Sequence, residues 1–452
     1  MQSVSVDTHT STGWRKQRHA YSLAESHASI TIPRSASFFR KFLAFAGPGF
    51  LIAVGYMDPG NWATDLAGGA QFGYLLLSVV MISNMMAVIL QALSAKLGIV
   101  TGRDLAQACH DHFSPPVAFA LWMLAEIAIV ACDLAEVLGS AIALQLLFGF
   151  PLIIGVLVTA ADVFVVLLLN HKGFRYIEAV VIGLIMLIML CFAVELFLAR
   201  PDWGGVLHGF VPTPALLRNP SALYIGIGIL GATVMPHNLY LHSSIVQTRQ
   251  FEHTPSGKRE AIKFATLDST LALTGALFIN AAILILSAAT FHTTGHHDVA
   301  EIQDAYQFLT PLLGTSLASI LFAVALLASG QNSTLTGTLA GQIVMEGFLN
   351  IHIQPWVRRL ITRAMAIIPA IIIIALKGEG STTELLVLSQ VVLSMQLSFA
   401  VFPLVAFTSD KHKMGEFANT TAMKVIAWGI AVIIAVLNGY LLVQTFIPLK
   451  SA

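Results

Sequence analysis

Two segments of the chain, 177 residues apart, combine a helix-breaking proline with groups that can bind a cation. Residues 55–61 read GYMDPGN and residues 232–238 read ATVMPHN. The offset aligns the two prolines and places Asp58 opposite Met235. Together the segments offer four kinds of ligand: a carboxylate (Asp58), an amide oxygen (Asn61), a thioether (Met235) and main-chain carbonyls freed by the prolines (Gly55 and Ala232).

These ligand types indicate which cation the two segments would bind. Carboxylate and carbonyl oxygens suit any divalent cation, whereas a thioether is soft and favours transition metals over Mg²⁺ or Ca²⁺. Met235 is one of 14 methionines, and most methionines fill cores. Its alignment with Asp58 is what distinguishes it from the others. The sequence therefore predicts a transition-metal site that is assembled from both segments.

A pair of carboxylates elsewhere in the chain has the spacing of a proton relay. Asp133 and Glu136 are three residues apart, which places both on one face of a helix. Adjacent acids in a medium of low dielectric repel each other, so one of them is expected to hold a proton near neutral pH. The alternative is a structural role, in which the two acids pair with Arg359 or with another arginine of the same helix.

Two further residues would extend that relay. His237 follows Met235 by two residues and could pass protons between the metal site and the carboxylate pair. Glu126 lies seven residues before Asp133, two helical turns away on the same face. Of the three cysteines, Cys132 and Cys191 lie in apolar runs and are predicted to be small core residues.

Composition shows what kind of element must position these groups. The chain of 452 residues is 56% hydrophobic and only 11% charged, whereas a soluble domain carries about 25% charged residues. A membrane-spanning helix needs about 20 apolar residues. Eleven segments qualify, at residues 43–70, 73–99, 117–147, 152–170, 176–198, 222–247, 268–290, 316–345, 360–376, 382–408 and 422–446.

The distribution of basic residues predicts how these spans are oriented. With the N-terminus inside, 20 of the 24 lysines and arginines fall on the cytoplasmic side, as the positive-inside rule requires. We therefore predict a multi-pass protein of the cell (inner or plasma) membrane with a cytoplasmic N-terminus and an extracytoplasmic C-terminus. Residues 1–40 are polar and are predicted to form a disordered cytoplasmic tail, and residues 41–446 the transporter domain.

The two prolines also predict the topology. A break inside a membrane helix survives only where it lines a cavity or binds something, and matched breaks in two halves indicate a transporter's substrate site. The breaks lie five spans apart, so the second half enters the membrane from the opposite side. The predicted fold is all-α, with an inverted 5+5 repeat, discontinuous helices 1 and 6, and a peripheral helix 11. Its parts are repeat one at about 43–198, repeat two at about 222–408 and helix 11 at about 422–446.

Other functions make different demands on the sequence. A sodium-coupled carrier of amino acids or other small solutes would hold a substrate carboxylate at helix N-termini, where Asp58 would repel it. No nucleophile–base arrangement or cofactor motif is visible, so we expect neither an enzyme nor a resident cofactor. The net charge is zero, which gives no basic footprint for nucleic acid. The expected partners are metal ions, protons and the lipid bilayer, with no obligatory protein partner.

The segments at 55–61 and 232–238 resemble the signature of the natural-resistance-associated macrophage protein (Nramp) family. Residues 330–338, GQNSTLTGT, are similar to that family's transport motif, and the resemblance covers about residues 40–446. Family members are LeuT-type inverted-repeat carriers that move Mn²⁺ or Fe²⁺ together with protons. The resemblance implies a bacterial proton-coupled symporter that imports Mn²⁺ and Fe²⁺, and also Cd²⁺ and Co²⁺, by alternating access.

The resemblance also implies roles for individual residues. It makes Asp58, Asn61, Met235 and the carbonyl of Ala232 metal ligands, and Gln390 joins them in some states. It supports a relay at the carboxylate pair of helix 3. The expected proton pathway as a whole comprises Asp58, Asp133, Glu136, His237, Glu126 and Arg359. A magnesium-transporting branch of the family lacks both the Asn and the Met of the two motifs. This chain keeps both, which favours a transition metal.

Overall fold

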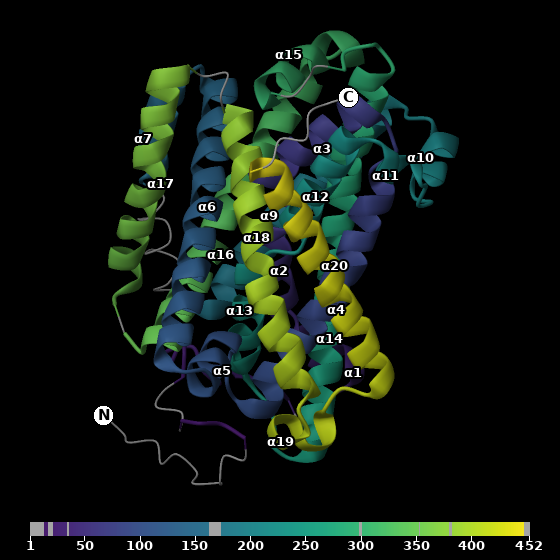
Figure 1. The fold of residues 1–452 in the computed structure, drawn as a ribbon. Coiled ribbons are helices and arrows are strands. Elements are labelled where there is room, and N and C mark those ends of the chain that lie inside the picture. The colour runs from purple at the N-terminus through teal and green to yellow at the C-terminus, as the bar shows by residue number, and fades with distance from the viewer. Residues whose placement is uncertain are drawn as a thin grey trace.

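The protein is a bundle of long helices whose two ends differ. The computed structural model describes residues 13–16, 21–33, 36–161, 173–297, 301–351, 353–378 and 382–446. Short helices α5 (Leu105–His112) and α19 (Lys411–Met414) mark one end of the bundle, at the bottom of Figure 1. Helices α10 (Trp203–Gly209) and α15 (Ile302–Leu313) mark the other. We refer to these as the α5 end and the α15 end.

Within the described residues, nine helical segments are long and apolar enough to cross a membrane, and they confirm nine of the eleven predicted spans. The unbroken ones include α4 (Leu77–Thr101), α6 (Pro115–Phe148), α9 (Phe174–Ala199), α14 (Pro255–Ser287) continued by the π-helix η2 (Ala288–His292), α16 (Ser316–Leu349), α17 (Pro355–Lys377), α18 (Thr382–Ser409) and α20 (Thr421–Phe446). Short connecting elements are α11 (Ala215–Arg218) and η4 (Gly415–Phe417).

Three of the eleven predicted spans, the first, the fourth and the sixth, are interrupted or extend beyond the described residues, and the sixth is also one of the nine segments above. The first span is α2 (Pro48–Gly55) followed by α3 (Pro59–Phe72), and α1 (Phe38–Phe45) precedes it with a bend of 47°. The fourth begins as α7 (Leu152–Thr159), and its predicted continuation over 162–170 lies outside the described residues. The sixth is α12 (Pro220–Thr233), then α13 (Pro236–Ile245) and the 3₁₀ turn η1 (Val246–Thr248).

Both breaks have the same backbone geometry. Asp58 and Met235 are extended, with φ/ψ of −67°/164° and −77°/128°, and each is followed by a proline at the first position of the next helix. Proline is favoured there because its missing N–H would be unsatisfied in any case. The prolines thus end α2 and α12 and begin α3 and α13. This confirms the two discontinuous helices predicted from the sequence.

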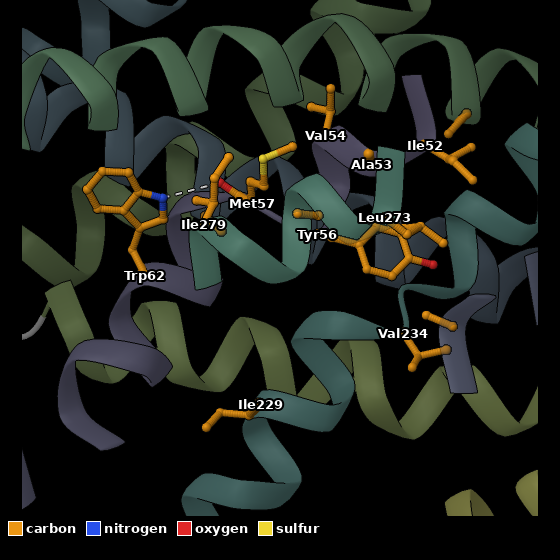
Figure 2. Packing of buried hydrophobic residues seen from close by; sticks show 14 of the residues in the cluster. Ile52, Ala53, Val54, Tyr56, Met57, Trp62, Ile229, Val234, Leu273 and Ile279 are labelled. Carbon is orange, nitrogen blue, oxygen red and sulfur yellow. Dashed lines mark hydrogen bonds between the residues drawn. The ribbon is translucent and has the colours of Figure 1, made fainter. Parts of the chain in front are cut away.

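Close packing holds the broken helices inside the bundle. Figure 2 shows the Trp62 indole donating a hydrogen bond to the main-chain oxygen of Met57, at 3.2 Å, across the first break. The same ring packs against Phe192 of α9 and Phe322 of α16. Gly139 of α6 lies directly against the ring of Pro59, where a Cβ would collide. A small residue at this point lets α6 approach the break closely.

The N-terminal segment departs from the predicted disordered tail where it is described. Ile30–Thr31 (β1) pairs in parallel with Arg249–Gln250 (β2), and Leu23 is only 7% exposed. Low hydrophobicity suggested disorder, but a few apolar anchors and main-chain hydrogen bonds are enough to seat these residues on the bundle. Residues 1–12, 17–20 and 34–35 lie outside the described residues.

Candidate functional site

Asp58 occupies the first break and is completely buried. Its Oδ1 accepts hydrogen bonds from the main-chain N–H of Asn61, at 2.8 Å, and from the side-chain amide of Asn61, at 2.7 Å. The first of these bonds caps α3, because the opening N–H groups of a helix have no partner within the helix. The carboxylate is therefore fixed in place by the same sequence that breaks the helix.

The amide of Asn61 connects the two breaks. Its Nδ2 lies 3.2 Å from the carbonyl oxygen of Gly55 and 3.1 Å from that of Ala232, in addition to Asp58 Oδ1. Three oxygens from both repeats thus converge on one donor group. A cation needs such an arrangement of oxygens, and rotating the amide by 180° would add its own oxygen to them. The structure therefore brings Asp58, Asn61, Gly55 and Ala232 together.

Gln390 of α18 also reaches this site. Its Nε2 donates to Asp58 Oδ2 at 3.3 Å, while its Oε1 is buried without a hydrogen-bond partner among the described residues. Gly60 makes the approach possible, because a Cβ at that position would overlap the Gln390 amide. An unpartnered buried oxygen beside a carboxylate is a further potential cation ligand.

Met235 lies at the second break and is fully buried. It belongs to a small apolar cluster with Ala128 and Cys132 of α6 and Leu393 of α18. Unlike Asp58, its side chain does not cap the helix that follows. The predicted thioether ligand is thus placed at the break, with packing contacts on the side of α6.

Cys132 links the second break to the carboxylate pair. Its Sγ lies 3.9 Å from His237 Nε2 and 3.7 Å from Glu136 Oε1. The sequence predicted only a small core residue here, and that interpretation missed these polar contacts. His237, Glu136 and Asp133 are all buried. The Nδ1 atom of His237 has no hydrogen-bond partner among the described residues.

An arginine of α17 faces the carboxylate pair. Arg363 Nη1 lies 3.5 Å from Glu136 Oε2 and 3.4 Å from the carbonyl oxygen of Asp133, and its Nη2 donates to Thr334 at 3.1 Å. Thr334 in turn donates to Glu136 Oε2 at 3.3 Å. The predicted partner, Arg359, has a side chain outside the described part of the structure.

Glu126 of α6 forms an ion pair with another arginine of α17. Arg358 Nη2 donates to both carboxylate oxygens of Glu126, at 3.0 and 2.9 Å, and the Trp122 indole donates to Oε1 at 3.1 Å. Glu126 thus lies near the α5 end of α6, in a second ion pair between α6 and α17. The structure places it on the α17 side of α6, as it does Glu136.

A cavity approaches the site from the α15 end. It has a volume of about 810 Å³ and lies between α3, α12 and α18, with Thr64, Tyr224, Glu301 and Glu384 among its lining residues. Thr64 donates to the carbonyl oxygen of Asn61 at 3.0 Å, so the cavity reaches to within one helical turn of the site. The site residues themselves remain buried.

Comparison with known proteins gives the same picture over nearly the whole chain. Residues 49–444 match the family model described as natural resistance-associated macrophage protein-like. A divalent metal cation transporter MntH of Listeria monocytogenes serotype 4a is 64% identical over 440 residues, which are 97% of this chain and 98% of the relative. A protein of the same name from Nostoc sp. is 64% identical over 424 residues, 94% of this chain and 96% of the relative.

Solved structures agree on the fold. A manganese transporter of Eremococcus coleocola matches with a TM-score of 0.87 and 42% identity, over 92% of this chain and 90% of that chain. Mhp1, a nucleobase-cation-symport-1 family transporter, matches with a TM-score of 0.60 and 17% identity, over 87% of this chain and 88% of that chain. The second likeness shows the shared inverted-repeat fold alone. The family match and the identities to its members show that this chain belongs to the Nramp family.

Proposed function

We propose that the chain is a proton-coupled symporter that imports divalent transition-metal ions, Mn²⁺ and Fe²⁺ and also Cd²⁺ and Co²⁺, by alternating access. The observation that carries the proposal is the convergence of three oxygens, from Gly55, Asp58 and Ala232, on the Asn61 amide. The names of the relatives, divalent metal cation transporter and manganese transporter, support the choice of cargo.

In this proposal the cation takes the place that the Asn61 amide hydrogens now fill. The amide turns to present its oxygen, Gln390 supplies a further oxygen, and Met235 supplies a soft contact. Among the described residues no group of three or more His, Cys, Asp or Glu side chains is arranged so that it could hold a metal ion. The cation would therefore be held by one carboxylate and by neutral ligands, which suits a site that must also release its ion.

The proton would travel on the other side of the second break. His237, Cys132 and Glu136 form a chain of contacts of 3.9 and 3.7 Å that leads away from the metal site towards α17. A buried carboxylate with a nearby arginine can alternate between its charged and neutral forms as a proton passes. Metal and proton would thus share a starting point and then leave by different paths.

We assign the α5 end to the cytoplasm. Basic residues gather there, including Arg103 just before α5, Lys413 of α19 and Lys258, which donates to the carbonyl oxygen of Val100 at the end of α4, in agreement with the positive-inside rule. The cavity at the α15 end would then be the entrance for metal from outside. Two carboxylates in its lining, Glu301 and Glu384, would raise the local concentration of cations.

The test is transport by the full chain in liposomes that contain a metal-sensitive dye and a pH dye. Addition of Mn²⁺ should cause both metal entry and internal acidification, in buffers with and without Na⁺. Metal entry without acidification would remove the proton from the proposal. Uptake that requires Na⁺, or uptake of an amino acid in place of metal, would favour the sodium-coupled carrier instead.

A further inference from the structure

The N-terminal segment crosses the α5 end of the bundle and is attached to it at several places, among them Trp14, Leu23 and Ala28. We call residues 13–16 and 21–33 the N-terminal strap. Its first attachment is Trp14, whose ring meets Phe407 of α18 edge-on at 5.5 Å. The guanidinium of Arg103 lies 4.9 Å from the centre of that ring, and Lys413 Nζ lies 5.2 Å from it. Two cations on an aromatic face can stabilise such a contact by about 1 kcal/mol each.

The second attachment is Leu23, which is seated against α16. Its main-chain N–H donates to Glu346 Oε2 at 3.0 Å, and its side chain is 7% exposed. The residue has a φ of +53°, a conformation that costs a non-glycine residue about 1 kcal/mol or more. Such a conformation persists only where surrounding contacts hold it. Leu23 is therefore an anchor and not a chance contact.

The third attachment joins the strap to the end of the second broken helix. The N–H of Ala28 donates to the carbonyl oxygen of Gln247, at 3.0 Å, and β1 pairs with β2 directly after η1. Gln247 and β2 continue the chain from α13. One end of the strap is thus fixed to α13, and the other is fixed to α16, α18 and the turn before α5.

Those two groups of helices close the α5 end of the site. Helix α13 runs from the second break to the α5 end, and Ser243 Oγ accepts the N–H of Leu105 of α5 at 2.9 Å. Tyr240 of α13 packs edge-on against Phe348 of α16, with ring centres 5.8 Å apart. In the transport cycle proposed above, separation of α13 from α5 and α16 would open a path from the buried site to this end. The strap bridges that same seam.

We propose that the N-terminal strap is a latch that holds α13 against α5 and α16, and that its release accompanies opening of the site at the α5 end. The strap would set the balance between the two orientations of the carrier without touching the cation. In this way the strap would regulate the transport cycle that we propose above. Only this consequence for transport rests on the proposed function. The latch itself can be measured with neither metal nor proton gradient present.

The native Cys109 of α5 is the probe for this measurement. It is fully buried in α5, which is joined to α13 by the bond from the Leu105 N–H to Ser243, so separation of α13 from α5 would expose it. The full-length protein in lipid nanodiscs is treated with a hydrophilic maleimide, and modification of Cys109 is followed by peptide mass spectrometry. The double variant Trp14→Ala/Leu23→Ala removes the ring that contacts Phe407 and the buried side chain of the second attachment. Glu25→Ala, an exposed position of the same strap, is the matched control.

A second probe distinguishes an opened latch from a loosened fold. Thr64→Cys places a thiol in the cavity at the α15 end, where Thr64 is 2% exposed. In the double variant we expect Cys109 to react at least about fivefold faster and the thiol at position 64 to react more slowly, with both rates unchanged in Glu25→Ala. An unchanged Cys109 rate would overturn the proposal. A rise at both probes, or an equal rise in Glu25→Ala, would also overturn it, since the strap would then be only a stabilising contact.

Discussion

The two helix breaks share one backbone geometry but carry opposite side-chain chemistry. At the first break, Asp58 is a charged acceptor that caps the next helix and receives donors from Asn61 and Gln390. At the second, Met235 is neutral, forms no cap and packs among apolar neighbours of α6 and α18. The inverted repeat places the same kind of break in two helices. The residue at each break decides what that break can bind.

The surroundings of the two breaks differ in the same way. Oxygens converge at the first break, so its environment suits a hard cation. The second break is followed by His237, whose ring leads through Cys132 to Glu136. This contrast suggests that the first break provides most of the affinity for metal. The second would provide selectivity and a way out for the proton.

The strongest way to test this contrast is to remove the charge at the first break. Asp58→Ala should lower metal binding and uptake more than about 100-fold, because it removes the carboxylate from the converging oxygens. Loss of a residue that merely hydrogen-bonds to a metal ligand already lowers affinity or activity by about 10–100-fold. Uptake of Mn²⁺ into liposomes and titration calorimetry would measure both effects.

Asp58→Asn is the matched control for the helix cap. Its amide oxygen can still accept the Asn61 N–H, so folding and thermal stability should stay near those of the parent while binding is lost. Normal Mn²⁺ uptake by either variant would show that Asp58 serves only as a cap, and the contrast between the breaks would disappear.

The next largest effect is expected where the second break meets the carboxylate pair. Glu136→Gln keeps the shape and the contact with Thr334 but cannot carry a proton. Metal-driven acidification should fall at least about tenfold, as for loss of a proton-transfer group, while metal affinity changes little. A pH dye inside the liposomes and calorimetry would separate the two.

Arg363 makes a control necessary for that variant. Without the Glu136 charge its buried guanidinium loses a partner, and this alone destabilises a protein. The double variant Glu136→Gln/Arg363→Gln removes the unpaired charge and should recover stability but not acidification. Full acidification in the double variant would assign Glu136 a structural role.

The breaks, and the residues that stand at them, could be predicted because the responsible effects are local. Proline acts on its own helix, and the 177-residue offset aligns Asp58 with Met235 in the sequence itself. The arginine that faces Glu136 could not be identified in this way. Arg359 and Arg363 are four residues apart, on one face of α17, so only the depth of α17 beside α6 selects between them.

Other features depend on partners that are distant in the sequence. Cys132 lies in an apolar run, and nothing near it indicates a histidine 105 residues away. The strap has the composition of a disordered tail, and its order depends on two apolar anchors, Trp14 and Leu23, together with main-chain bonds to remote segments. Composition averages over such anchors and therefore does not detect them.

Hard and soft chemistry can be separated at the second break. Met235→Ala should leave Mn²⁺ uptake reduced but measurable, since the oxygens of the first break remain and water can fill the gap. It should reduce Cd²⁺ uptake more and admit Ca²⁺ or Mg²⁺, with a change in discrimination of about 1–3 kcal/mol. Competition uptake would measure it, with Met57→Ala, a buried methionine beside the other break, as control. Unchanged exclusion of Ca²⁺ would mean that cavity size sets selectivity.

The smallest expected effect concerns Cys132, which joins the two functions that we propose for the second break. A thiol spans the 3.9 Å to His237 and the 3.7 Å to Glu136, but a serine hydroxyl needs oxygen and nitrogen partners within about 3 Å. Cys132→Ser should therefore weaken both contacts, at a cost of about 1 kcal/mol, or about fivefold in the rate of acidification. Metal affinity should change less, because Cys132 only packs beside Met235. Stopped-flow records of the pH dye and of metal entry would compare the two rates, with Cys191→Ser, in α9, as the matched control. Equal losses of metal entry and acidification would show that Cys132 supports Met235 alone, and the second break would then have no separate connection to the proton path.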